Sequence, residues 1–211
     1  DIPGVDEHAM PVKPVSAFLD RWREAVDRVL DDDGETCRLA VVGGGAGGVE
    51  LLLSVQHRLA GLLAERGLSA ERIEYVLVAA SARPLSSFNS RTSARFERIL
   101  DERGIETHFD SRVVGVEEDV LVCGDGDRLP YDELVWVTSP SPADWLEDTG
   151  LETTKRGFVA VDEHLRSTSH EDVFAAGDVA TIIDHPRPKS GVFAVRAGPP
   201  LAENLRRTLQ G

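Results

Sequence analysis

The run Arg38-Leu39-Ala40-Val41-Val42 is followed directly by Gly43-Gly44-Gly45-Ala46-Gly47-Gly48, and this stretch decides the fold. The first five residues form a short, largely apolar run, which is typical of a strand buried on both faces of a parallel sheet. Apolar residues after the glycines recur at helical spacing and predict a long helix that ends near Gly67. A strand, a G-x-G-x-x-G loop and a helix in this order predict a dinucleotide-binding fold.

Each glycine of the motif has an expected role. Gly43 permits the tight turn, Gly45 lets a pyrophosphate approach the backbone, and Gly48 lets the helix pack closely against the strand. The helix that starts here directs its free N–H groups and the positive end of its dipole toward the phosphates. The alternative is a flexible glycine turn without a ligand.

Further strands and helices alternate along the chain and predict an α/β fold with right-handed crossovers. Apolar spacing predicts helices over residues 14–30 and 90–103, the second ended by Gly104. Strands are expected at 73–80, 105–109 and 134–137. Three short runs between turn-rich stretches, at 113–116, 120–123 and 128–130, predict a small antiparallel meander. The expected result is a three-layer fold of helices, parallel sheet and meander.

The sequence pattern changes near residue 140, where we expect a domain boundary. Residues 1–31 form an entry segment and helix, and residues 32–140 form the nucleotide-binding domain. Residues 141–211 form a second unit with a linker, a hairpin and a helix from about Gly198 to Leu209.

Composition excludes several classes of protein. The net charge of −14 argues against a nucleic-acid binder, whose phosphate contacts need clustered cations. No apolar run is long enough to span a bilayer, and the first residues lack the features of a signal peptide. Cys37 and Cys123 have no metal-ligand spacing and are expected to be buried thiols, so no metal site is predicted. A cytoplasmic location fits this pattern.

The nucleotide motif is incomplete in one respect. An acidic residue ordinarily ends the second strand and accepts hydrogen bonds from the ribose hydroxyls. Here that strand ends in Ala79-Ala80-Ser81, without a carboxylate. Arg83 follows and could favour a 2′-phosphate, hence NADPH, or it could be an ordinary exposed arginine. The choice between NADH and NADPH stays open.

Three stretches together resemble the pyridine nucleotide-disulfide oxidoreductase superfamily, whose members bind FAD and NAD(P)H. Residues 42–50 are similar to its second glycine motif, with Glu50 two residues after the last glycine. Residues 134–140 are similar to its strand-to-Ala-Thr-Gly junction and place Thr138 among the cofactor-binding residues. Residues 157–180 are similar to its second flavin motif. The resemblance implies that Asp178 holds the ribityl chain of FAD and that Gly177 permits close approach.

The same resemblance implies a hydride transfer from nicotinamide to flavin, with a small-molecule electron acceptor that the sequence does not identify. Glu50 would lie near the nicotinamide as a positioning or proton-linked carboxylate and is the candidate catalytic residue. The alternative for Glu50 is a surface carboxylate in the first turn of a helix, favoured by the dipole.

A closer likeness is to type II NADH dehydrogenase-like proteins, and among them to the flavoprotein region N-terminal to selenide, water dikinase. Residues 11–15 and 189–201 carry this likeness. It implies that Val195 and Arg196 lie beside the flavin ring; the alternative is a helix-capping loop. Candidate partners are therefore a fused or separate selenide, water dikinase domain and a second copy of this chain.

The resemblance also implies that residues 32–140 bind NAD(P)H and that residues 141–211 are the returning segment of an FAD domain. No counterpart of the first FAD glycine loop precedes Asp1, so we expect this chain alone to bind FAD weakly and to be inactive. A different class of function is a nucleotide-binding or regulatory module that keeps the fold without turnover.

Overall fold

The computed structural model describes residues 2–31, 36–137 and 142–210. The chain forms two compact units, Asp1–Thr138 and Ser139–Gly211. Each unit contains its own cluster of buried apolar side chains, so each is described separately.

The first unit is built on a five-stranded parallel sheet, as the sequence predicts. In spatial order its strands are β1 (Met10–Pro11), β8 (Glu133–Trp136), β2 (Cys37–Val42), β3 (Ile73–Val78) and β4 (Glu106–His108). From β2 the chain passes outward to β3 and β4, then returns to the opposite side of β2 as β8. The carboxyl ends of β2 and β8 therefore flank a topological switch point, where open α/β sheets bind their ligands.

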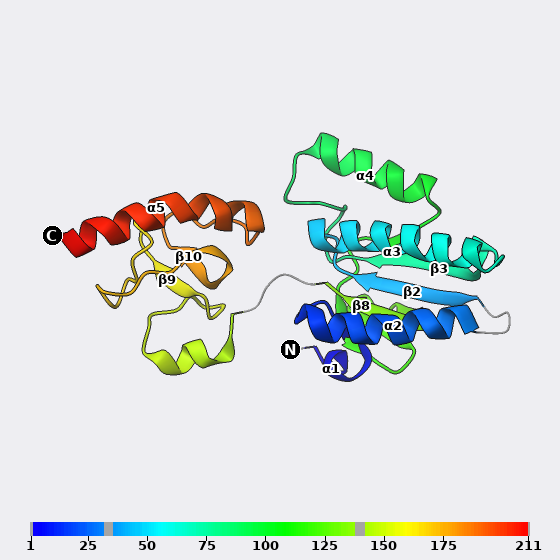
Figure 1. Ribbon diagram of the computed structural model, residues 1–211. Coiled ribbons are helices and arrows are strands. Elements are labelled where there is room, and N and C mark those ends of the chain that lie inside the picture. Colours follow the sequence, from blue (N-terminus) through cyan, green and yellow to red (C-terminus); the bar gives the residue numbers. More distant parts are fainter. Residues whose placement is uncertain (1, 32–35, 138–141, 211) are drawn as a thin grey trace. The chain divides into compact units, whose positions relative to one another are not determined.

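Alternating side chains of the sheet serve two different cores. Leu39 and Val41 of β2 pack with the helices α2 (Val15–Asp31), α3 (Ala46–Glu65) and α4 (Ser90–Glu102). Figure 1 shows these three helices running along the sheet. Ala40 and Val42 pack on the other face with a three-stranded antiparallel sheet of β5 (Val113–Val116), β6 (Val120–Cys123) and β7 (Arg128–Pro130). The predicted three-layer α/β fold is confirmed.

Helix ends follow from glycines at the expected places. Gly104 has φ of 66° directly after the C-cap of α4, and the Ile105 N–H donates to the Leu100 carbonyl at 3.0 Å. Gly67 has φ of 70° and ends α3 in the same way. These left-handed conformations cost glycine little and other residues more. Two short elements in this unit, α1 (Val5–His8) and the 3-10 helix η1 (Ala70–Arg72), complete the connections.

The second unit is small and has a two-stranded parallel sheet at its centre. Strand β9 (Val159–Val161) pairs with β10 (Ala180–Ile182), and Thr153 bridges antiparallel to Val159 across the turn that contains Gly157. The 3-10 helices η2 (Asp144–Thr149) and η3 (Gly177–Val179) and the helix α5 (Gly191–Gln210) complete it. Figure 1 shows α5 lying along β9 and β10.

Helix α5 corrects one prediction. It begins at Gly191 rather than near Gly198, so Pro199 and Pro200 lie inside it. The sequence suggested a later start because its helical spacing was read from Leu201, Leu205 and Leu209, all of which follow the two prolines. As a result, Val195 and Arg196 are helical and do not belong to a helix-capping loop.

Candidate functional site in the glycine loop and the Asp178 pocket

The glycine loop leaves β2 at the switch point and is held from both sides. The Gly43 N–H donates to the Val78 carbonyl of β3 at 2.9 Å, and the Val137 N–H donates to the Val42 carbonyl at 2.8 Å. Gly43 has φ of 136°, and a Cβ atom there would lie 1.9 Å from the Val137 carbonyl oxygen. Only glycine fits this turn.

Gly48 and Gly45 are glycines for opposite reasons. A Cβ atom on Gly48 would lie 1.8 Å from the carbonyl oxygen of Gly43, so Gly48 packs against the start of its own loop. A Cβ atom on exposed Gly45 would have nothing within 4 Å. Space in front of Gly45 is what the approach of a pyrophosphate to the backbone requires.

The start of α3 offers N–H groups beside this space that have no hydrogen-bond partner among the described residues. Gly45 is the N-cap and supplies no side-chain cap, and the first turn contains no acidic residue. The first helical hydrogen bond runs from the Val49 N–H to the Gly45 carbonyl at 3.1 Å. The N–H groups of Ala46, Gly47 and Gly48 come before this first bond and have no acceptor within the helix. They are therefore suited to bind an anion.

The loop after β3 lies against the glycine loop and carries Arg83. The Leu85 N–H donates to the Gly44 carbonyl at 2.8 Å, and the Ser81 hydroxyl donates to the Arg83 carbonyl at 2.8 Å. Arg83 itself is exposed, as is Ala80, two residues after the end of β3. The structure thus brings the predicted Arg83 and the position of the missing carboxylate to the side of the predicted phosphate cradle.

Glu50 is exposed and is the fifth residue of α3, beyond the first turn. Its exposure agrees with the alternative of a surface carboxylate near the start of the helix, and its place near a nicotinamide stays a prediction. Thr138 lies outside the described residues. Its neighbour Val137 borders the loop, because its Cγ1 is 3.4 Å from where a Cβ atom on Gly47 would lie.

Asp178 and Gly177 lie in the second unit, in η3 just before β10. Gly177 has φ of 75°, and a Cβ atom there would lie 3.4 Å from the Cβ of Ala194 on α5. One carboxylate oxygen of Asp178, Oδ1, is buried and has no hydrogen-bond partner among the described residues. A buried acceptor without a partner costs free energy, so this oxygen is suited to accept a hydrogen bond from a ligand.

A pocket of about 370 Å³ adjoins Asp178 between η3, β10 and α5. Gly177, Asp178 and Arg196 line it, together with Arg187 and Lys189. Val195 does not line this pocket, and 77% of its surface is exposed. Of the two α5 residues that resemblance placed beside the flavin, the structure brings only Arg196 to the Asp178 pocket.

Sequence reasoning missed four residues that shape these sites. Leu85 acts through its backbone N–H, and Val137 through its backbone and its Cγ1 methyl, contacts that leave no distinctive signal in a sequence. Arg187 and Lys189 lie in a segment of irregular backbone before α5, and only the fold shows that this segment adjoins Asp178. Composition could have drawn attention to Lys189, because it is one of only 3 lysines among 23 basic residues.

Within residues 2–31, 36–137 and 142–210, no group of three or more His, Cys, Asp or Glu side chains is arranged to hold a metal ion. None of the helices in this same part of the chain has the length and apolarity needed to cross a bilayer.

Known proteins share this architecture. A type II NADH:quinone oxidoreductase of Staphylococcus epidermidis is 25% identical over 223 residues, covering 100% of this chain and 55% of that protein. The structure of NDH2 from Plasmodium falciparum in complex with NADH superposes with a TM-score of 0.76 at 19% identity, covering 86% of this chain and 41% of that one. The water-forming NADH oxidase from Lactobacillus brevis bound to NADH gives 0.71 at 19% identity, covering 97% and 43%.

The chain therefore spans about half the length of the curated relatives it matches, 55% in the case just described. Residues 1–198 match the sequence profile of the pyridine nucleotide-disulphide oxidoreductases, which includes the glycine loop, Asp178 and Arg196. This match covers both units of the structure. The chain belongs to the pyridine nucleotide-disulphide oxidoreductase family.

Proposed function

We propose that this chain is the nucleotide-binding part of an FAD-dependent NAD(P)H oxidoreductase. The observation that carries the proposal is the glycine loop at the switch point, with open space at Gly45 and an uncapped helix N-terminus behind it. The residues present fit both cofactors. Gly45 and the N–H groups of α3 would hold the pyrophosphate of NAD(P)H, and the unpaired oxygen of Asp178 would accept a hydroxyl of the flavin ribityl chain.

FAD, when bound, supplies the acceptor for a hydride from the nicotinamide. The contribution of the protein is to bind and orient both groups. The first turn of α3 neutralises phosphate charge through its N–H groups, and Val137 limits the space beside Gly47. Glu50, exposed one turn further along α3, is proposed as the carboxylate that orients the nicotinamide or exchanges protons with solvent. Thr138 is proposed as a neighbouring cofactor contact.

The position of Arg83 beside Gly44 supports NADPH as the donor. No carboxylate ends β3 to accept the ribose hydroxyls, and the exposed guanidinium can pair with a 2′-phosphate. The same absence of a carboxylate supports the second candidate, a nucleotide-binding module without turnover. Nucleotide binding distinguishes both candidate functions from a chain that binds no nucleotide. Turnover by the whole protein distinguishes the oxidoreductase from the module without turnover.

The test is a calorimetric titration of the chain with NADH and, separately, with NADPH. We expect submillimolar binding of at least one of them. Gly45→Glu should abolish it, because a Cβ at this position meets no atom within 4 Å and the added carboxylate repels phosphate. The control is Gly61→Glu, the same change on the same helix at another open position. Equal affinity in both variants, or no binding by the unaltered chain, contradicts the proposal.

For the partners, we propose an association with a selenide, water dikinase domain. The sequence likeness at residues 11–15 and 189–201 supports it. A reading of the whole coding sequence tests for a fused domain, and co-purification tests for a separate one. A homodimer and a cytoplasmic location complete the proposal; light scattering and cell fractionation test them.

A further inference from the structure

A separate pocket of about 310 Å³ lies in the first unit. Its lining includes Met10, where β1 begins, and Glu133, where β8 begins. Both strands run parallel to β2, whose other end carries the glycine loop. We call it the α2 pocket, because three of its charged side chains come from that helix. It therefore lies at the opposite end of the sheet from the proposed NAD(P)H site and is not part of that site.

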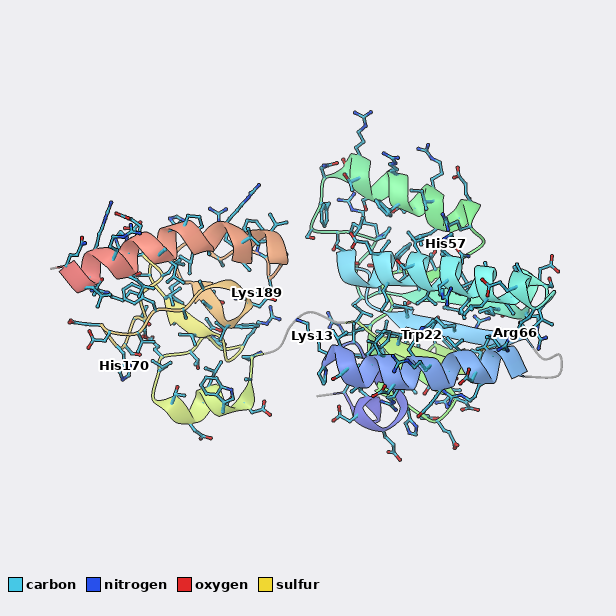
Figure 2. The ribbon with its side chains drawn as sticks, in the orientation of Figure 1. Lys13, Trp22, His57, Arg66, His170 and Lys189 are labelled. Atoms are coloured by element: carbon cyan, nitrogen blue, oxygen red, sulfur yellow. The ribbon has the colours of Figure 1, made fainter. Side chains whose placement is uncertain are left out.

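Helix α2 supplies Arg21, Glu24 and Arg28 to this pocket. Their spacing of three and four residues places them on one side of the helix. Phe18 and Trp22 anchor the helix in the core, with their ring centres 6.3 Å apart, and Figure 2 labels Trp22 on α2. Because this packing fixes the side that α2 turns toward the sheet, it also holds the three charged side chains at the pocket.

The two arginines are held by contacts that leave some of their donors free. Nη1 of Arg21 donates to the Ala9 carbonyl at 2.7 Å, and Nε of Arg28 donates to Oε1 of Glu133 at 2.7 Å. Neither guanidinium has another hydrogen bond or direct ion pair within the described part of the chain. Each therefore keeps N–H groups with which it can bind a carboxylate.

Carboxylates outnumber the arginines in the same lining. The carboxylates of Glu24 and Glu118 are exposed and have no hydrogen bond or direct ion pair among the described residues. Glu133 is 8% exposed, and its bond from Arg28 uses only one of its two oxygens. Burying a charged pair of this kind costs free energy, which favours a role for it in binding. The lining holds Arg21 and Arg28 against Glu24, Glu118, Asp132 and Glu133.

This mixture of charges restricts the ligand. An anion alone would meet the free carboxylates, and a cation alone would leave the arginine donors unused. His8 also lines the pocket, but even a protonated imidazole there would leave an excess of negative charge. A complementary small molecule therefore carries one carboxylate and more than one ammonium group.

We propose that the α2 pocket binds a free basic amino acid such as lysine. Its carboxylate lies on Arg21, because Arg28 is already paired with Glu133. Its ammonium groups lie on Glu24 and Glu118. This site goes beyond the proposed function and does not rest on it, since it shares no residue with the glycine loop or with the Asp178 pocket.

The test compares L-lysine with two matched probes. Cadaverine is lysine without its carboxylate, and L-norleucine is lysine without its terminal ammonium group. In calorimetric titrations of the 211-residue chain at low ionic strength, we expect lysine to bind at least about tenfold more tightly than either probe. Equal affinities for lysine and cadaverine would overturn the proposal, because they would show an acidic surface that attracts any cation.

Variants separate the two ends of the ligand. Arg21→Gln should weaken lysine binding about tenfold without weakening cadaverine binding, whereas Glu24→Gln should weaken both. A purely structural role for Arg21 would weaken both probes equally and would contradict the assignment. Arg23→Gln is the matched control, because it makes the same change on α2 outside the pocket lining, and it should alter neither affinity.

Amide NMR shifts of the unaltered chain give a readout that does not depend on the folding of a variant. Lysine should shift residues 8–10, 21–28 and 131–134. No shift in these segments with millimolar lysine would overturn the pocket proposal. Shifts of residues 43–48 by NADH test the proposed function separately, so the failure of one proposal is distinguishable from the failure of the other.

Discussion

The carbonyl oxygen of Gly43 lies 1.8 Å from the point that a Cβ atom on Gly48 would occupy. The first and last glycines of the loop are thus in direct backbone contact, and this contact sets the angle at which α3 leaves the sheet. The loop between them is closed by its own ends.

Gly48→Ala should therefore destabilise the first unit by about 3 kcal/mol, because the methyl group meets a backbone oxygen that cannot move aside alone. Gly45→Ala should change the free energy of unfolding by less than about 1 kcal/mol, since its Cβ points into open space. Urea unfolding followed by circular dichroism measures both. Similar losses in the two variants would show that the loop is not closed in this way.

The nucleotide preference should respond to a carboxylate at the end of β3. We expect Ala80→Asp to raise NADH affinity and lower NADPH affinity, each about tenfold, because the new carboxylate accepts ribose hydroxyls and repels a 2′-phosphate. Arg83→Gln should lower NADPH affinity alone. Calorimetry on each variant tests this, with Ala94→Asp on the exposed face of α4 as control. An unchanged ratio of NADH affinity to NADPH affinity would contradict the proposed role of the loop after β3 in nucleotide choice.

An ion network across three strands should make stability depend on pH. Arg38 lies 2.8 Å from Glu74 and 2.5 Å from Glu106, and His108 is 2.5 Å from Glu106. Burial raises the pKa of Glu106, but hydrogen bonds from His108 and Arg38 outweigh it, so the net pKa is lowered. Because the pKa of Glu106 is lower in the folded state, the ionised carboxylate stabilises the fold at pH values above the ordinary glutamate pKa. This stabilisation is lost as the pH falls through the lowered pKa.

We therefore expect Glu106→Gln to cost about 0.5–1 kcal/mol at pH 7, a small amount because the Glu106 side chain is 44% exposed. The difference from the unaltered chain should shrink toward zero below about pH 4. Urea titrations at a series of pH values measure it. Glu97→Gln on the exposed face of α4 serves as control, and a difference that persists in acid would refute the linkage.

Cys123 should be unreactive until the fold opens. It is 2% exposed, and burial together with Asp125 and Asp127 raises the pKa of its thiol. In a Cys37→Ser background, labelling by a disulfide reagent at pH 8 should be at least about a hundredfold slower than in urea, because the reactive thiolate is both rare and enclosed. Rapid labelling of the folded chain would show that the meander opens readily.

Local patterns predicted the first unit well. The strand from Arg38, the glycine loop and α3 each have a period or a motif within a few residues, and Gly104 ends α4 where left-handed backbone is needed. Strands β1 and β10 were not predicted, and β9 was expected only as part of a hairpin. Each has two or three residues and depends on a distant partner, such as Met10 on Val135. A pattern that short has no period to detect.

The two candidate sites, one in each unit, differ in the same way. The glycine loop is contiguous, so its residues were all named from the sequence. The Asp178 pocket is assembled from η3, β10, the segment before α5 and α5 itself. Resemblance found Asp178 and Arg196, but the position of Lys189 depends on its contact with Ala180, which no spacing rule contains.

Pro199 and Pro200 have a consequence for the chemistry of α5. Neither residue has an N–H group, so the carbonyl oxygens of Val195 and Arg196 lose the donors that a regular helix would direct at them from four residues ahead. The interruption falls one turn from Phe193, which lines the Asp178 pocket. Helix α5 thus contains, in mid-course, two carbonyl groups that receive no hydrogen bond from the residue four positions ahead.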